Sequence, residues 1–327
     1  MYNTHILTEI PLADSEAILD AHTLEQVPVT RWTAFSWSHS RHTLFATCRR
    51  RYYLHYYGSR RIRETNSRVV RAIWWLKQIT PMSAWIGTVV HEAAAAALRA
   101  VRDGMPVPDV RVLARERFAA GLEASARGRK LDGRWLVLWP DAYGGSGTGS
   151  PEELLEGLLD NLLASDTYKS LTNLPGGLFQ EIDEAFQSFE LEGIARLGTV
   201  RTFAIPDVLI LNDRTLRIVD WKTGSTTPDS VRWQAGIYQL YAGLTYDLQE
   251  EEISVEIVDL TQGSSGEPAG GTPGFAETRA FIETSIAEMV DLMADVDYHT
   301  VSIRDFPMTD DLTLCQTCNF KRACRRE

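Results

Sequence analysis

The spacing of apolar residues changes near residue 181 of this chain of 327 residues, and that change constrains the fold more than any other feature. Up to about residue 168 the apolar positions recur every three or four residues, which predicts amphipathic helices. Between residues 181 and 222 they alternate or form β-branched runs, which predicts strands. Three consecutive antiparallel strands are expected over 181–192, 199–211 and 215–222, with turns at Gly193 and at Asn212-Asp213.

Helices are expected on both sides of this segment. They cover residues 38–58, 84–103, 109–126, 152–168, 229–247 and 277–297, and a short strand is expected over 253–260. This order predicts a mixed α/β fold, in which helices flank a mixed central sheet and an N-terminal helical insertion precedes it. We divide the chain into an acidic extension (1–30), a helical part (31–180), a core that contains the sheet (181–300) and a C-terminal tail (301–327).

The composition excludes several classes of protein. A chain of 327 residues, 44% of them hydrophobic, is long enough to bury a sizeable core. No apolar run approaches the roughly 20 residues that a membrane span requires, so no membrane partner is expected. The acidic extension carries five Asp or Glu side chains and neither Lys nor Arg, so a secretory signal with its basic start is not expected. We therefore predict a protein of the reducing cytoplasm.

Two aspartates and a lysine form the first candidate site. Asp207 and Asp220 lie thirteen residues apart, on neighbouring predicted strands joined by a tight turn. A hairpin brings such side chains to one edge, and convergent carboxylates are a natural site for Mg²⁺ or Mn²⁺. Lys222 shares a strand face with Asp220, so its ammonium can orient a water or neutralise developing phosphate charge. The set suits metal-assisted phosphodiester hydrolysis, and the alternative is an ordinary polar pair at the strand ends.

Two predicted helices carry further candidates. Gln234 and Tyr238 are four residues apart and share a helix face, which is expected to face the carboxylates or a nucleic-acid end. The alternative is an ordinary core face. His91 follows Gly87 by four residues, and the glycine lets another segment approach that face of the helix. His91 is either a structural residue or, as a neutral imidazole, a metal ligand.

All four cysteines are candidates for one metal site. Cys315, Cys318 and Cys324 form a C-x2-C-x5-C pattern, whereas Cys48 lies far upstream in the first predicted helix. A reducing compartment disfavours disulfides, whereas iron–sulfur clusters and structural Zn²⁺ both accept four thiolates. The spacing leaves cluster and zinc open, and either would clasp the N-terminal helix to the tail.

Taken in order, these elements resemble the PD-(D/E)XK nuclease superfamily. Within it the chain resembles the RecB-like branch with a C-terminal iron–sulfur cluster, which includes CRISPR-associated RecB-type exonucleases and the AddB nuclease domain. The resemblance rests on Cys48-Arg49-Arg50-Arg51-Tyr52-Tyr53, Gly87-x3-His91, Pro206-Asp207, Asp220-Trp221-Lys222, Gln234-x3-Tyr238 and the three tail cysteines. The chain departs from the family pattern at Arg49, where proline is common, and residues 104–178 match no element of it.

The resemblance implies a restriction-endonuclease-like core and a specific site. It implies one or two Mg²⁺ or Mn²⁺ ions held by His91, Asp207, Asp220 and the carbonyl of Trp221. Lys222 would position the attacking water, and Gln234 and Tyr238 would contact DNA or support the site. The four cysteines would hold a [4Fe–4S] cluster, with Zn²⁺ as the less favoured occupant.

The resemblance also implies a DNA-binding surface on a chain whose net charge is −11. The segment from Arg41 to Arg71 contains nine Arg and a single acidic residue, Glu64. Its arginines would contact phosphates and its aromatic rings would stack on bases. The candidates are Arg49, Arg50, Arg51, Tyr52, Arg60 and Arg61. The alternative is that the tyrosines pack in the core and several arginines pair with acidic residues.

The implied function is that of a metal-dependent DNA nuclease, an exonuclease that prefers single strands or free ends. DNA repair, CRISPR adaptation and phage defence are the implied settings, possible partners being a helicase or a defence complex. The chain contains no helicase P-loop. Two alternatives stay open: a non-catalytic nucleic-acid-binding subunit that keeps the nuclease fold, and a nuclease that works only within a complex.

Overall fold

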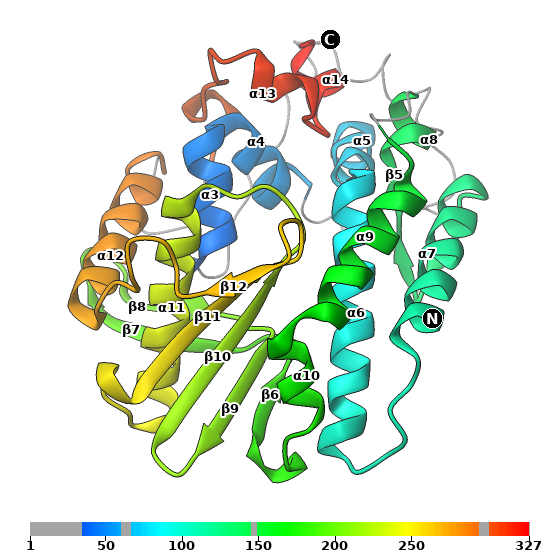
Figure 1. Ribbon diagram of the computed structural model, residues 1–327. Coiled ribbons are helices and arrows are strands. Elements are labelled where there is room, and N and C mark those ends of the chain that lie inside the picture. The colour runs from blue at the N-terminus through cyan, green and yellow to red at the C-terminus, as the bar shows by residue number, and fades with distance from the viewer. Residues whose placement is uncertain (1–34, 60–66, 145–148, 294–300, 327) are drawn as a thin grey trace, which may run out of the picture.

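A five-stranded mixed sheet lies at the centre of the fold, with helices on both of its faces (Figure 1). The computed structural model describes residues 35–59, 67–144, 149–293 and 301–326, so the predicted acidic extension lies outside the described residues. Across the sheet the strands follow the order β12 (Ser264–Gly266), β11 (Ile253–Asp259), β10 (Thr215–Lys222), β9 (Val208–Asn212) and β6 (Phe179–Ile182). β10 and β11 are parallel and the other neighbours are antiparallel, which confirms the predicted mixed α/β fold.

Strand β10 is buried on both of its faces. Leu216 and Ile218 point into the hydrophobic core that contains α11 (Pro228–Tyr246), whereas Val219 and Trp221 point into the core that contains α6 (Met82–Arg102). A strand buried in this way reads as a nearly continuous apolar run rather than an alternating one. Helix α11 also makes the crossover that the parallel pair β10–β11 requires.

The prediction of three consecutive antiparallel strands is wrong. The predicted segment 199–211 is two strands, β8 (Gly198–Phe203) and β9, and they belong to different sheets. β8 pairs with β7 (Ser188–Ile194) and, in parallel, with β1 (Ser36–Ser38) in a separate three-stranded sheet. The chain changes sheets at Pro206, which has no backbone N–H for a ladder bond.

The remaining elements follow most of the predicted helices. Helix α6 and α7 (Val110–Ala126) confirm the expectations for 84–103 and 109–126, and α11 confirms 229–247. The predicted helix 152–168 is two helices, α9 (Pro151–Ala164) and α10 (Asp166–Thr172), because Ser165 is not helical and caps the second one.

The other helices are α5 (Arg68–Lys77), α8 (Trp139–Tyr143), α12 (Phe275–Asp291), α13 (Thr313–Gln316), α14 (Lys321–Cys324) and the 3₁₀ turns η4 (Gly176–Leu178), η5 (Glu250–Glu252) and η6 (Ile303–Asp305). Short strands pair as β2 (Ile79–Thr80) with β5 (Val137–Leu138) and as β3 (Lys130–Leu131) with β4 (Arg134–Trp135). In the described ranges no helix combines the length and apolar character that crossing a membrane demands.

The predicted helix 38–58 is interrupted at Cys48. It consists of α3 (His39–Thr47), α4 (Arg49–Tyr53) and the π-helical turn η3 (Leu54–Gly58). Cys48 is extended, with φ −160° and ψ 111°, and its Sγ accepts the backbone N–H of Arg51 at 3.4 Å. The thiol therefore acts as the N-cap of α4, a place where side-chain acceptors satisfy free backbone N–H groups.

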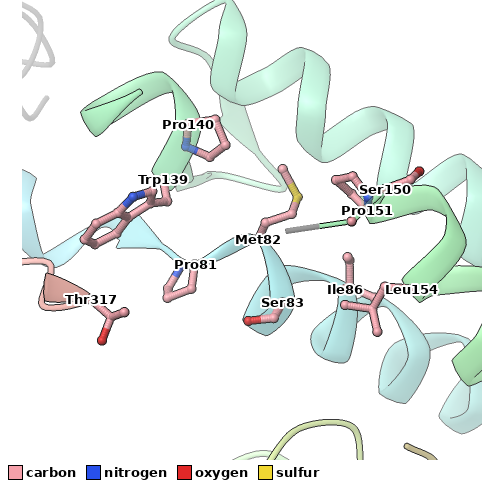
Figure 2. A pocket seen from close by; sticks show the side chains of 11 residues that line it. Pro81, Met82, Ser83, Ile86, Trp139, Pro140, Ser150, Pro151, Leu154 and Thr317 are labelled. Carbon is pink, nitrogen blue, oxygen red and sulfur yellow. The ribbon is translucent and has the colours of Figure 1, made fainter. Parts of the chain in front are cut away.

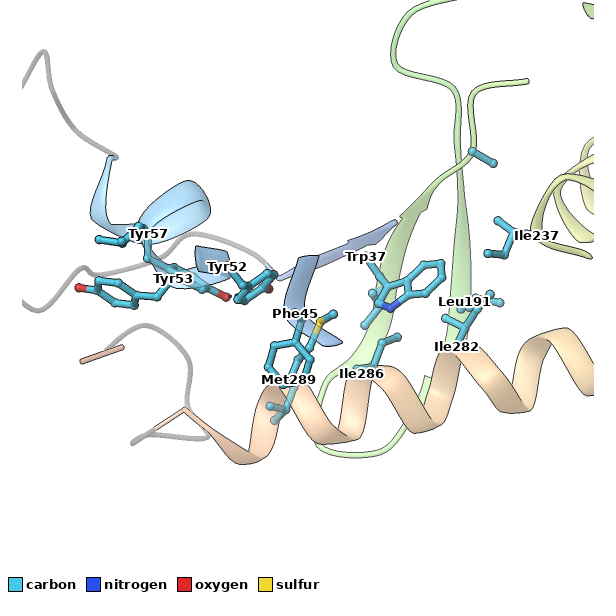
Figure 3. Packing of buried hydrophobic residues seen from close by; sticks show 14 of the residues in the cluster. Trp37, Phe45, Tyr52, Tyr53, Tyr57, Leu191, Ile237, Ile282, Ile286 and Met289 are labelled. Carbon is cyan, nitrogen blue, oxygen red and sulfur yellow. Dashed lines mark hydrogen bonds between the residues drawn. The ribbon is translucent and has the colours of Figure 1, made fainter. Parts of the chain in front are cut away.

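A core of aromatic residues joins the beginning of the described chain to its end. Figure 3 shows Trp37 of β1 beside α12, where its indole N–H donates to Ser285 Oγ at 2.9 Å. The rings of Tyr52, Tyr53 and Tyr57 are fully buried and surround Phe306 of the tail, with centroid separations of 5.3–6.2 Å. This packing places the tail against α4, as Figure 1 also shows.

Candidate active site

The β9–β10 hairpin brings the two predicted aspartates to one edge of the central sheet. The last antiparallel pair in the hairpin is Val208 opposite Val219, so Asp207 and Asp220 are the next residues on their strands. The Asp207 carboxylate accepts the backbone N–H of Trp221 at 2.7 Å, which fixes its position beside the end of β10. The convergence expected from the sequence is therefore present.

Helix α6 contributes His91 to the same edge. His91 Nδ1 lies 2.8 Å from Asp207 Oδ1. Burial disfavours the imidazolium form, but the Asp207 carboxylate outweighs that effect and the pKa of His91 is raised. The close packing of α6 against the end of β10 depends on Gly87, where an added Cβ would lie 2.5 Å from Thr223 Oγ1. The absence of a side chain at Gly87 thus lets α6 contact the segment that follows Lys222.

A chain of polar contacts connects the second aspartate to helix α11. The Lys222 ammonium contacts the Asp220 carboxylate and also donates to Gln234 Oε1. Gln234 Nε2 donates to the Tyr238 hydroxyl at 2.8 Å, and that hydroxyl donates to the Ile205 carbonyl at 3.1 Å. Gln234 and Tyr238 therefore hold Lys222 against Asp220, and they occupy the helix face that the sequence indicates.

Burial shifts the pKa values of two acidic groups of the site. Asp220 is only 3% exposed, and burial followed by the nearby Asp207 raises its pKa, although Lys222 and His91 oppose the shift. Burial, together with Asp220 and Asp207, also raises the pKa of Tyr238, so its hydroxyl stays protonated at neutral pH. Burial therefore disfavours the ionised form of Asp220 even though Lys222 and His91 lie close to it.

A cleft gives access to this site beside Lys222. It has a volume of about 330 Å³ and is bounded by the beginning of α11 and by the β11–β12 hairpin. Lys222, Pro228, Val231, Asp259 and Ser265 are among its lining residues. Lys222 is thus the residue of the site that both contacts Asp220 and lines this cleft.

Sequence reasoning missed two neighbours of the site. Asp183 follows β6, and its backbone N–H donates to the Asp207 carbonyl at 2.8 Å. Burial, followed by Asp207, raises the pKa of the Asp183 side chain. His39 begins α3, and burial, then His42 and Lys222, lower its pKa to about 4. A polar residue directly after an apolar strand was a signal for Asp183, whereas no pattern marked His39.

The four cysteine thiols lie within electrostatic reach of one another. Burial, followed by the effects of Cys318, Cys48 and Cys315, raises the pKa of Cys324 to about 12. All four are free thiols, and Cys318 Sγ accepts the backbone N–H of Phe320 at 3.4 Å. The structure thus brings Cys48 to the tail, although most of the chain separates it from Cys315 in sequence. The described cysteines do not converge closely enough to hold a metal ion as they stand, so the predicted four-cysteine clasp stays a prediction.

The predicted nucleic-acid-binding residues have different environments. Tyr52 is fully buried, so the expectation that it stacks on bases is not met. Arg50 Nε donates to the Phe306 carbonyl at 2.7 Å, and Arg51 influences the thiol of Cys318, so both arginines face the tail. Arg49 is exposed, and its guanidinium lies 5.4 Å from the Phe45 ring centroid. Arg60 and Arg61 lie outside the described residues.

The donor groups at the sheet edge suit a hard divalent cation. Within the ranges that the structure describes, no three His, Cys, Asp or Glu side chains converge closely enough to hold a metal ion as placed. The candidate ligands contact protein groups instead, since Asp207 bonds to His91 and Trp221 and Asp220 contacts Lys222. The two carboxylates and the imidazole nevertheless suit Mg²⁺ or Mn²⁺ by their chemistry, and a divalent cation would favour the ionised form of the buried Asp220, whose pKa is raised.

The contact at Gly87 leads to a first prediction. Gly87→Ala is expected to displace Thr223 and with it the end of β10, since the new Cβ would lie 2.5 Å from Thr223 Oγ1. Such overpacking costs about 1–3 kcal/mol, which thermal unfolding would measure. The double variant Gly87→Ala/Thr223→Ala should recover most of that loss, because it removes the clashing hydroxyl. Gly157→Ala in α9 is the matched control, since nothing lies within 4 Å of its added Cβ. Equal melting temperatures for Gly87→Ala and the wild type would contradict the close contact.

Comparison with known proteins agrees with this geometry. Residues 36–325 match the family model of the PD-(D/E)XK nuclease superfamily, and this range contains His91, Asp207, Asp220 and Lys222. Among curated proteins, none is similar enough in sequence to count as a match. The chain therefore belongs to the PD-(D/E)XK nuclease superfamily, whose members are metal-dependent enzymes that hydrolyse phosphodiester bonds in nucleic acids.

Proposed function

We propose that this protein is a Mg²⁺- or Mn²⁺-dependent deoxyribonuclease that degrades DNA from single strands or free ends. The observation that carries the proposal is the connected set of Asp207, Asp220 and Lys222 at one sheet edge, with a cleft opening beside the lysine. A surface pair at the strand ends would not need a buried aspartate with a raised pKa. A resemblance to RecB-like nucleases supports a setting in DNA repair, CRISPR adaptation or phage defence.

Each residue of the site has a role in this proposal. Asp207, Asp220, His91 and the Trp221 carbonyl would hold the divalent cation. When bound, that ion supplies Lewis-acid stabilisation of the charge that develops on the phosphate. Lys222 reaches the cleft, where its ammonium orients the attacking water and stabilises the phosphoryl oxygens. Gln234 holds the Lys222 ammonium, and Tyr238 holds Gln234, so the lysine keeps one orientation.

The cleft beside Lys222 is the proposed entry for the strand that is cleaved. A space of about 330 Å³ beside Lys222 is large enough for one nucleotide. The preference for single strands or free ends follows from the resemblance to RecB-like exonucleases. Arg49 is the exposed member of the predicted basic set within α4, and it would contact backbone phosphates. Arg50 and Arg51 would instead compensate negative charge at the cysteines, because both lower thiol pKa values there.

We also propose that the four cysteines hold a [4Fe–4S] cluster. Their mutual proximity, the N–H groups that point at Cys48 and Cys318, and the adjacent guanidinium groups support an anionic sulfur-ligated centre. The proposed role is structural, because the ligands connect α4 to the tail.

Cleavage by anaerobically purified protein tests the proposed function. Labelled linear single strands, linear duplexes and closed circles are incubated with Mg²⁺, Mn²⁺ or EDTA. We expect divalent-dependent degradation of linear single strands, slower attack on duplex ends and intact circles. Degradation of circles would replace the exonuclease proposal with an endonuclease. An absence of cleavage with every cation, by protein whose metal content is intact, would favour a binding subunit or a partner-dependent enzyme.

A further inference from the structure

A second cavity lies outside the proposed catalytic site, between the beginnings of α6 and α9, helix α8 and the tail. Its volume is about 310 Å³. Apolar side chains make up most of its wall, as Figure 2 shows for Met82, Ile86, Trp139, Pro140, Pro151 and Leu154. Ser83, Ser150 and Thr317 add a few hydroxyl groups. An apolar wall with few polar groups is typical of a ligand pocket, and this volume is near the lower end for one.

Helix α6 connects this cavity to the catalytic residues. Ser83 lines the cavity, Gly87 contacts Thr223, and His91 contacts Asp207. These three residues are spaced by four and therefore lie along one ridge of the helix. Eight residues separate Ser83 from His91, which corresponds to about 12 Å along the helix axis. That length is comparable with three or four stacked nucleotides at about 3.4 Å each.

The charge beside the cavity suits a nucleic-acid strand. Lys321 Nζ lies 4.9 Å from the ring centroid of Trp139, which is a wall of the cavity. Lys321 and Arg322 also lie 4.4 Å and 4.6 Å from the ring centroid of Tyr143. A base held in the cavity would thus have cations near the Trp139 wall for its phosphate, on the side away from Glu152, which accepts a hydrogen bond from the lining residue Ser150.

We propose that this cavity binds one unpaired nucleobase of the DNA strand whose phosphate is cleaved, several nucleotides away from the catalytic site. The inference rests on the proposed function and adds a substrate subsite to it. The cavity has room for a single base and an aromatic wall on which every base can stack. The hydroxyl groups of Ser83 and Thr317 would meet the edge of that base, and Lys321 would meet the backbone beside it.

Filling the cavity tests this subsite. Ser83 and Ala84 are neighbouring exposed residues in the first turn of α6, but only Ser83 lines the cavity. Ser83→Trp is therefore the blocking variant and Ala84→Trp the matched control. Leu154→Trp blocks the cavity from α9 and guards against a local effect at Ser83. Binding of single-stranded oligonucleotides, each with one abasic position, is measured by fluorescence anisotropy in the Asp220→Asn background, so that cleavage does not interfere.

We expect one abasic position to weaken binding by about tenfold, which is the effect of losing one stacked base. Ser83→Trp and Leu154→Trp should weaken binding of the intact oligonucleotide to a similar extent and abolish that positional effect. Ala84→Trp should retain the profile of the parent. A flat abasic profile in the parent, or an unchanged profile in both blocking variants, would overturn the subsite.

Failure of the subsite is distinguishable from failure of the proposed function. Wild-type cleavage together with a flat abasic profile would remove the subsite and leave the nuclease. If binding depended on the abasic position and on an open cavity, but the wild type cleaved no DNA, the subsite would stand and the catalytic proposal would be wrong. Protein that binds no DNA at all would overturn both.

Discussion

Asp220→Asn is expected to lower the rate of DNA cleavage by about 10³-fold or more, because it removes a buried carboxylate from the proposed metal site. Asparagine keeps the shape of the side chain while it removes the charge that a divalent cation needs. Folding should not suffer, since burial raises the pKa of Asp220 and its ionised form is therefore the less stable one in the metal-free protein. The melting temperature without metal should stay the same or rise.

Asp213→Asn is the matched control for this variant. Asp213 is exposed in the β9–β10 turn, at a φ of 52°, a conformation that asparagine tolerates well. The control should cleave at the wild-type rate. If Asp220→Asn retained activity within about tenfold of the wild type, the carboxylate would not be essential and the proposed site would be wrong. Isothermal titration with Mg²⁺ or Mn²⁺ adds a second readout, because metal binding should weaken only in Asp220→Asn.

Cys318→Ala is expected to remove the metal centre of the tail and to destabilise the whole protein. Cys318 is 8% exposed and lies within electrostatic reach of Cys48 and Cys315, so it occupies the interior of the proposed four-thiol site. A metal that binds the folded state contributes its binding free energy to folding, which amounts to several kcal/mol. At about 2–4 °C for each kcal/mol, the melting temperature should fall by roughly 10 °C or more.

Iron, sulfide and zinc analysis of anaerobically purified protein accompanies this experiment. Gln316→Ala is the matched control, because Gln316 is exposed between Cys315 and Cys318 and carries no thiol. The wild type and the control should each contain about four iron atoms per chain, as a [4Fe–4S] cluster requires. One zinc atom instead would replace the cluster by a zinc site. An unchanged melting temperature in Cys318→Ala would contradict a structural role for the cysteines.

Local sequence patterns were sufficient to predict the residues whose relative positions are set within one strand, helix or hairpin. The apolar run before Asp220, the Asp-x-Lys spacing and the i,i+4 pair on α11 all follow from the geometry of a single strand or helix. The β9–β10 hairpin needed only a tight turn between two strands, so the convergence of Asp207 and Asp220 was predictable. The role of Gly87 was predictable as a close approach, although its partner Thr223 was not.

Patterns failed where distant packing outweighed local propensity. The segment Ser38–Gly58 has a helical composition, yet Cys48 is extended, because α4 is directed toward the tail and bonds to Pro307 and Phe306. Tyr52 has the amphipathic character of a stacking residue, but neighbouring aromatic rings, among them Phe306 of the tail, leave it fully buried. The strand order was missed for two reasons. The chain changes sheets at Pro206, and β8 pairs with β1, which lies at the N-terminal end of the described chain, more than 150 residues earlier in sequence.

The sequence by itself determined the elements and the chemistry of this protein: helices before strands, two carboxylates and a lysine on one hairpin, and four thiols in two places. These features depend on neighbours along the chain, whose relative positions are set by the regular repeats of the helix and the strand. Only the tertiary structure decided which distant groups meet. It brought the His91 imidazole into contact with the Asp207 carboxylate and Cys48 close to the cysteines of the tail. It also buried Tyr52 and formed the cavity beside Trp139. Such contacts depend on how buried surfaces pack together, and packing is a property of the whole fold rather than of any segment.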